Sequence, residues 1–128
     1  MSPDVPPCWN LRTRVVGGPG TVSRLGAVAR GLGMRVVAYD PFVGDGRFRE
    51  AGIEREASME KALAAADFVT LHLPLTDETR GTIGREAIAA MRDGARLINA
   101  ARGALVDEDA LIEAIRSGKL AGAALDVF

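Results

Sequence analysis

The order of segments along the chain constrains its fold more than any other feature of the sequence. Short apolar runs alternate with segments whose apolar residues recur at helical spacing. This alternation predicts an α/β fold, in which parallel strands are joined by right-handed helical crossovers. The strands are continuously apolar, as in a doubly wound sheet that helices cover on both faces. The six predicted strands are RVVGG, RVVAYD, GIERE, FVTLHL, ARLINA and GAALDVF.

Capping residues and apolar periodicity mark the helices between these strands. Apolar residues recur at helical spacing from 25 to 32, and Ile88 and Met91 indicate a later helix. Ser58 is a predicted N-cap, and Asp107 is a second one. The helix after Asp107 opens with acidic residues and ends near an arginine, which suits the helix dipole.

Composition favours one soluble globular domain. The chain has 128 residues, of which 48% are apolar and 26% charged. The net charge of −1 leaves no basic surplus for phosphates, so we expect no nucleic-acid partner. Three prolines indicate a loose arm over residues 1–10, which leaves 11–128 as the domain.

Several further classes are disfavoured by the sequence. The longest apolar stretches are too short to span a bilayer, and the first residues lack the features of a signal peptide. Cys8 is the only cysteine, so no internal disulfide can form. We therefore expect a cytoplasmic protein with no membrane partner, and we assign no metal ligands.

Unusual residues cluster at the carboxyl ends of the predicted strands. Ligands of an open parallel sheet bind outside these ends, so the clustering predicts a site at this edge. The residues are Gly18 and Gly20 after the first strand, Asp40 after the second, His72, Leu73 and Pro74 around the end of the fourth, Ala100, Ala101 and Arg102 after the fifth, and Asp126 within the last.

The glycine-rich stretch GGPGTVSRLG partly matches the dinucleotide fingerprint G-x-G-x-x-G. Gly18 and Gly20 hold its first two places, and Ser23 holds the third. The backbone amides of Thr21 and Val22, at a helix N-terminus, would bind phosphate. Serine at the third place is expected to loosen helix–strand packing without loss of the turn. The alternative is that the two glycines simply make a tight turn.

Asp40 stands at the end of the second predicted strand, twenty residues past Gly20. A carboxylate there accepts hydrogen bonds from the adenosine ribose of NAD and repels the 2′-phosphate of NADP. The alternative is an Asp-Pro turn with Pro41.

Arg102 lies between an apolar strand and the helix that Asp107 caps. Its guanidinium can bind a carboxylate in two places and polarise a neighbouring carbonyl. The alternative is a surface arginine in a phosphate or structural contact. Asp126 is either a contact of the cofactor amide or a plain strand-end acid. His72, the sole histidine, is interpreted as packing beside the ligand rather than as catalytic.

Four stretches resemble a known family, in order and nearly without gaps from Gly33 to Phe128. They are GMRVVAYDPF, ADFVTLHLPLTDETRGTIG, MRDGARLINAARGALVDEDAL and GKLAGAALDVF. They resemble the NAD-binding domain of the D-isomer-specific 2-hydroxyacid dehydrogenases, which include phosphoglycerate dehydrogenase and hydroxypyruvate reductase. The resemblance implies a Rossmann-type doubly wound parallel sheet, NAD as cofactor, a small 2-oxo or 2-hydroxy acid as substrate, and a homodimer in the full-length form.

The resemblance also implies roles for individual residues. Asp40 would hold the adenosine ribose, and Arg102 would bind the 2-oxo acid as well as line the cofactor site. Asp126 would meet the nicotinamide amide. The other implied contacts are Thr21 and Val22 with the pyrophosphate, and Leu73, Pro74, Ala100 and Ala101 along the cofactor.

The chain departs from the family in ways that bear on activity. Upstream of Gly33 the match degrades, and Ser23 replaces a glycine. The family's substrate domain, its catalytic glutamate and its acid/base histidine have no counterpart in these residues, which predicts a partial cofactor domain. We expect the 128 residues alone to be inactive. The alternatives are a non-catalytic, nucleotide-responsive interaction module of the corepressor kind, and an inactive truncated copy or gene-model error.

Overall fold

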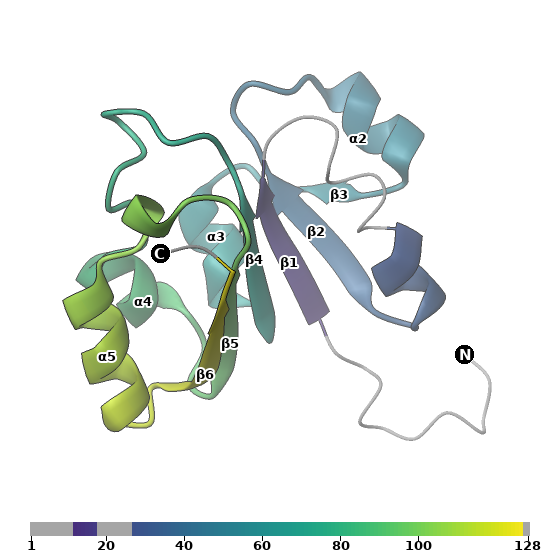
Figure 1. Cartoon of the computed structure of the whole chain (residues 1–128). Helices are drawn as coiled ribbons and strands as arrows, with labels where there is room; N and C mark the ends of the chain where they lie inside the picture. The colour runs from purple at the N-terminus through teal and green to yellow at the C-terminus, as the bar shows by residue number, and fades with distance from the viewer. Residues whose placement is uncertain (1–11, 18–26, 127–128) are drawn as a thin grey trace.

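Six parallel strands form one sheet in the order β3-β2-β1-β4-β5-β6 (Figure 1). The structure is a computed structural model that describes residues 12–17 and 27–126. The order reverses beside β1, which pairs with β2 on one side and with β4 on the other. This confirms the predicted doubly wound parallel sheet. The strands are β1 (Arg12–Gly17), β2 (Arg35–Tyr39), β3 (Glu54–Arg55), β4 (Phe68–His72), β5 (Ala95–Asn99) and β6 (Leu120–Leu125).

Helices connect the strands, and both predicted N-caps are confirmed. Ser58 Oγ accepts a hydrogen bond from the Lys61 amide at 3.3 Å, and Asp107 Oδ1 accepts one from the Ala110 amide at 3.1 Å. The helices are the described segment 27–31, α2 (Asp45–Ala51), α3 (Met59–Ala64), α4 (Arg85–Ala90) and α5 (Glu108–Arg116), with a short 3₁₀ helix η2 at Gly103–Leu105.

Several elements differ from the expectations, and β1, for example, begins at Arg12 rather than at the start of RVVGG. Helix α2 was not predicted, because it is short, begins Asp-Gly and buries only Phe48. Strand β6 begins at Leu120 rather than at Gly122, and Asp126 follows the strand instead of lying within it. The strand is rich in alanine and glycine, which have low strand propensity, so its limits are poorly marked in the sequence.

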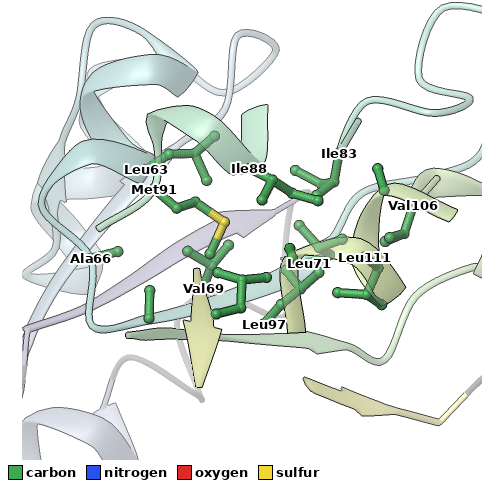
Figure 2. Packing of buried hydrophobic residues seen from close by; sticks show 14 of the residues in the cluster. Leu63, Ala66, Val69, Leu71, Ile83, Ile88, Met91, Leu97, Val106 and Leu111 are labelled. Atoms are coloured by element: carbon green, nitrogen blue, oxygen red, sulfur yellow. The ribbon is translucent and has the colours of Figure 1, made fainter. Parts of the chain in front are cut away.

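The larger apolar core fills the space between the sheet and α3, α4 and α5 (Figure 2). Leu71 and Leu97, on neighbouring central strands, are fully buried and meet Ile88 and Met91 around α4. A smaller cluster lies on the opposite face, where the helix at 27–31 and α2 cover β2; its members are Ala29, Val36, Ala38, Phe48 and Ile53. Helices therefore cover the two faces in different halves of the sheet.

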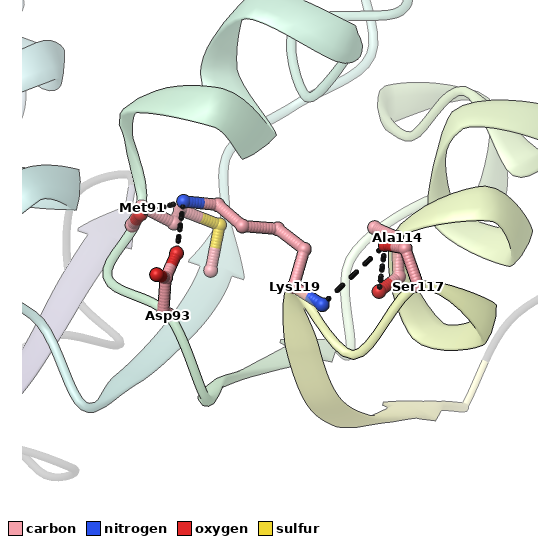
Figure 3. A network of polar contacts seen from close by, with 5 residues as sticks. All are labelled: Met91, Asp93, Ala114, Ser117 and Lys119. Atoms are coloured by element: carbon pink, nitrogen blue, oxygen red, sulfur yellow. Dashed lines mark hydrogen bonds and ion pairs between the residues drawn. The ribbon is translucent and has the colours of Figure 1, made fainter.

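Polar contacts tie together the turns at the amino edge of β5 and β6 (Figure 3). Lys119 Nζ donates to the Met91 carbonyl at 2.6 Å and to Asp93 Oδ1 at 2.8 Å. Ser117 Oγ accepts from the Lys119 amide at 3.4 Å and donates to the Ala114 carbonyl at 3.2 Å. The Lys119 charge is thus used within the structure, by a carbonyl and a carboxylate that precede β5.

Candidate functional site

The candidate site lies at the carboxyl edge of the sheet, around the end of β1. In the register of the strands, Val16 pairs with Tyr39 and Gly17 pairs with His72. Asp40, which directly follows Tyr39, therefore flanks the end of β1 on one side, and His72 flanks it on the other. Gly18, Gly20, Thr21, Val22 and Ser23 lie outside the described residues.

The two carboxylate oxygens of Asp40 have different surroundings. The residue is 4% exposed, and its Oδ1 accepts a hydrogen bond from the Phe42 amide at 2.9 Å. Its Oδ2 is buried and has no hydrogen-bond partner in the described part of the chain. A buried acceptor without a donor is costly. One oxygen thus makes the Asp-Pro turn, and the other is left for a donor such as a ligand hydroxyl.

Asn99, the last residue of β5, organises the loop that carries Arg102. Its side chain is fully buried. Asn99 Nδ2 donates to the Arg102 carbonyl at 2.8 Å, and Asn99 Oδ1 accepts from the Ala101 amide at 3.1 Å. Sequence reasoning missed this residue because it was counted as part of the strand. An asparagine that ends a strand two residues before a backbone turn is a known turn signal.

The guanidinium of Arg102 is exposed at this edge. Its Nη1 donates to the Ala101 carbonyl at 2.7 Å, the one side-chain hydrogen bond that the described structure gives it. Among the described residues it makes no ion pair. An exposed cation held next to its own loop, without an acidic partner there, remains able to bind an anion.

The loops after β4 and β5 are hydrogen-bonded to each other. The Gly81 amide donates to the Ala104 carbonyl at 2.8 Å, and the Ile83 amide donates to the Leu105 carbonyl at 2.9 Å. The Asp107 amide donates back to the Ile83 carbonyl at 3.0 Å. The segment after His72 and the segment that carries Arg102 are therefore one connected unit.

Asp126 closes this edge on the side of β6. Its amide donates to the carbonyl of Asn99 at 3.0 Å, so the residue is fixed to the end of β5. Its side chain is exposed. The predicted position at the ligand edge thus holds for the backbone, although the residue lies just beyond the strand.

His72 lies half-buried at the end of β4 and contacts a buried hydroxyl. The distance from Thr70 Oγ1 to His72 Nε2 is 2.8 Å. Burial lowers the pKa of the imidazole, since the charged form loses hydration. Burial thus favours the neutral form of the ring, which is compatible with packing beside a ligand.

We expect this histidine to make stability depend on pH. Because the pKa is lowered in the folded chain, the unfolded chain binds the proton more readily. The contribution of His72 to the free energy of unfolding is highest above about pH 6.5. It falls below that pH, until the imidazole of the folded chain also protonates. Urea midpoints of the unmutated chain and of His72→Gln, measured between about pH 5 and 8, check this. A difference between the two that did not change with pH would contradict it.

The described ranges 12–17 and 27–126 also bear on metal binding and on membrane insertion. No group of three or more histidine, cysteine, aspartate or glutamate side chains could hold a metal ion there. Over the same ranges, no helix combines the length and apolarity that a bilayer span requires.

A family model and individual proteins both match the chain. Residues 10–128 match the model described as "D-isomer specific 2-hydroxyacid dehydrogenase, NAD binding domain". The D-3-phosphoglycerate dehydrogenase of Bacillus subtilis is 46% identical over 106 residues, which are 83% of this chain and 20% of that protein. The enzyme of the same name in Mycobacterium leprae is 47% identical over 118 residues, which are 91% of this chain and 22% of that protein.

Solved structures give the same result for the fold. The NAD-complexed D-isomer specific 2-hydroxyacid dehydrogenase of Lactobacillus delbrueckii ssp. bulgaricus superposes with a TM-score of 0.86 at 35% identity, covering 94% of this chain and 36% of that one. The D-lactate dehydrogenase of Lactobacillus jensenii with NAD⁺ gives 0.85 at 35% identity, with the same coverage of 94% and 36%. The chain spans about a fifth of the length of the curated relatives it matches.

Proposed function

The chain belongs to the D-isomer specific 2-hydroxyacid dehydrogenase family, as its NAD-binding domain, and on this premise we propose that it is the cofactor part of an oxidoreductase. The reaction is hydride transfer between NAD(H) and a D-2-hydroxy acid or its 2-oxo acid. Enzymes of the family are NAD-dependent and act on small 2-hydroxy acids. The function of this particular chain is supported by the residues at the carboxyl edge of its sheet.

The observation that carries the proposal is the buried Oδ2 of Asp40, which has no partner in the described structure. This acceptor fits the ribose hydroxyls of NAD, and its negative charge disfavours the 2′-phosphate of NADP. Bound NAD would supply or accept the hydride at its nicotinamide ring. The backbone amides of Thr21 and Val22, beside Gly18 and Gly20, are proposed to bind the pyrophosphate.

On the other side of β1, we assign the reacting half of the ligands to the residues after β4, β5 and β6. Arg102 would hold the substrate carboxylate and polarise its carbonyl, since its exposed guanidinium is without an ion pair among the described residues. Asp126 would meet the nicotinamide amide. The residues proposed to line the cofactor and exclude water are Leu73, Pro74, Ala100 and Ala101.

The assembly and the location of the full-length protein are proposed from its family and its sequence. We propose a homodimer for the full-length form and a cytoplasmic location. The formal charge of −1 leaves no basic surplus to neutralise a nucleic-acid backbone. The proton that accompanies the hydride is assigned to a group of the full-length enzyme other than His72, because this imidazole lies half-buried against Thr70 at the end of β4.

The test is the cofactor preference of the chain itself. Replacing Asp40 with alanine should weaken NADH binding by about tenfold or more, because a hydrogen bond to a charged group contributes about 1.5–3 kcal/mol. The same change should weaken NADPH binding less, or improve it, because a repulsion is removed. Fluorescence titration of the 128-residue chain with each cofactor measures both affinities.

Glu60→Gln is the matched control, because it removes an exposed acid from α3. It should leave both affinities unchanged. Equal affinity of the unmutated chain for NADH and NADPH would argue against the role of Asp40, and so would an Asp40 variant that binds NADH normally.

A further inference from the structure

The buried carboxamide of Asn99 lies between three of the residues assigned to the site. It is fully buried, and both of its polar atoms are used by the loop that follows it. Its Oδ1 accepts from the Ala101 amide at 3.1 Å, and its Nδ2 donates to the Arg102 carbonyl at 2.8 Å. Its own carbonyl accepts from the Asp126 amide at 3.0 Å.

These contacts hold the backbone rather than the reactive groups. The Arg102 carbonyl also accepts from the Leu105 amide at 3.2 Å, at the end of η2. Two donors therefore hold the Arg102 carbonyl, while its guanidinium remains exposed. A guanidinium that forms two parallel hydrogen bonds with a carboxylate must be placed accurately. Its placement depends on the position of the backbone that carries the side chain.

The chemistry of the side chain is specific to this arrangement. A primary amide offers a donor and an acceptor on one short planar group, whereas an ionised aspartate offers acceptors only and leucine offers neither. Asn99 also faces the apolar core, on the same side of the sheet as Leu97 and Leu71. A polar group buried there must have its hydrogen bonds satisfied. The loop is therefore held in the one position that provides both partners of the Asn99 carboxamide.

We propose that Asn99 is a positioning residue of this site. Its buried side chain and its carbonyl fix the backbone of Ala101, Arg102 and Asp126. This inference rests on the proposed function, because Ala101 and Arg102 are assigned there to the cofactor and the substrate. Asn99 touches neither ligand itself. Its effect is expected to be local to the loop and separable from its contribution to stability.

The experiment compares three variants of the full 128-residue chain. Asn99→Leu keeps much of the volume and loses both hydrogen bonds. Asn99→Asp keeps the acceptor for the Ala101 amide and loses the donor to the Arg102 carbonyl. Leu97→Val, two residues earlier on the same strand and face, changes core packing alone. For each protein the urea midpoint, the hydrogen-exchange rate of the Ala101 amide and the NADH affinity are measured.

We expect Asn99→Leu to speed exchange of the Ala101 amide and to weaken NADH binding, each at least about fivefold, as the loss of a buried hydrogen bond implies. Asn99→Asp should restore slow exchange at Ala101. Leu97→Val should lower the urea midpoint and leave both local measurements unchanged. The proposal is overturned if Asn99→Leu leaves exchange at Ala101 unchanged, or if Leu97→Val alters it equally. Failure of the unmutated chain to bind NADH would instead refute the proposed function, because the exchange measurement does not need the cofactor.

Discussion

Replacing Arg102 with alanine is expected to lower kcat/KM for a 2-oxo acid by about 10²–10³-fold, in a protein that joins this domain to the substrate domain of a relative. The guanidinium is proposed to hold the substrate carboxylate and to stabilise charge that develops on the carbonyl oxygen. Both interactions are lost together in the alanine variant. Steady-state rates of NADH oxidation with glyoxylate, hydroxypyruvate and pyruvate measure the effect.

Arg96→Ala is the matched control for this prediction. Arg96 is an exposed arginine on β5, the strand that precedes the Arg102 loop, and its guanidinium lies over the Phe68 ring at 5.5 Å. Its loss should leave kcat/KM unchanged within about twofold, as for a surface change away from the site. NADH affinity should be nearly the same in both variants. A normal kcat/KM for Arg102→Ala would refute the assigned role.

Replacing Leu97 with alanine is expected to lower the free energy of unfolding by about 2–5 kcal/mol. Leu97 is fully buried on β5, where it packs in the larger core with Val69, Leu71 and Leu111. The change removes apolar area from the core and leaves a cavity that neighbouring strands cannot easily close. Urea denaturation followed by far-ultraviolet circular dichroism measures the loss.

Ile112→Ala provides the comparison for this core substitution. Ile112 is on α5, and it is 46% exposed. Because much of its surface stays in water, its truncation should cost less than about 1 kcal/mol. Equal losses for the two variants would show that the packing of β5 against the helices does not determine stability.

The sequence predicted the central strands well, because β-branched and apolar runs have few other uses in a chain of this composition. β2, β4 and β5 lie where RVVAYD, FVTLHL and ARLINA predicted them. Periodicity was less informative about burial. Of the apolar residues on the helix at 27–31 and just after it, Ala29 is buried, whereas Val28 is 62% exposed and Leu32 is 53% exposed. Spacing predicts a helix, but the neighbours available decide which side packs.

The location of the candidate site was predictable from the sequence, but only some of its residues and contacts were. Strand ends at one edge of a parallel sheet must lie together, so Asp40 and Arg102 could be selected without a structure. The contact of Asp40 Oδ1 is local, because the Phe42 amide lies two residues on, whereas the burial of Oδ2 without a partner among the described residues is not visible in the sequence pattern. The role of Asn99 depends on the path of the backbone after β5, which the sequence pattern does not describe.

The strand order also has a consequence for synthesis of the chain on the ribosome. β1 is made before β2, with which it can pair first, but Thr13 gains its second partner only when Phe68 has emerged. At about 5–20 residues per second, one edge of β1 stays open for several seconds. During that time it can pair with other nascent chains. Because the candidate site surrounds the end of β1, we expect it to be completed only after β4 has been made and paired.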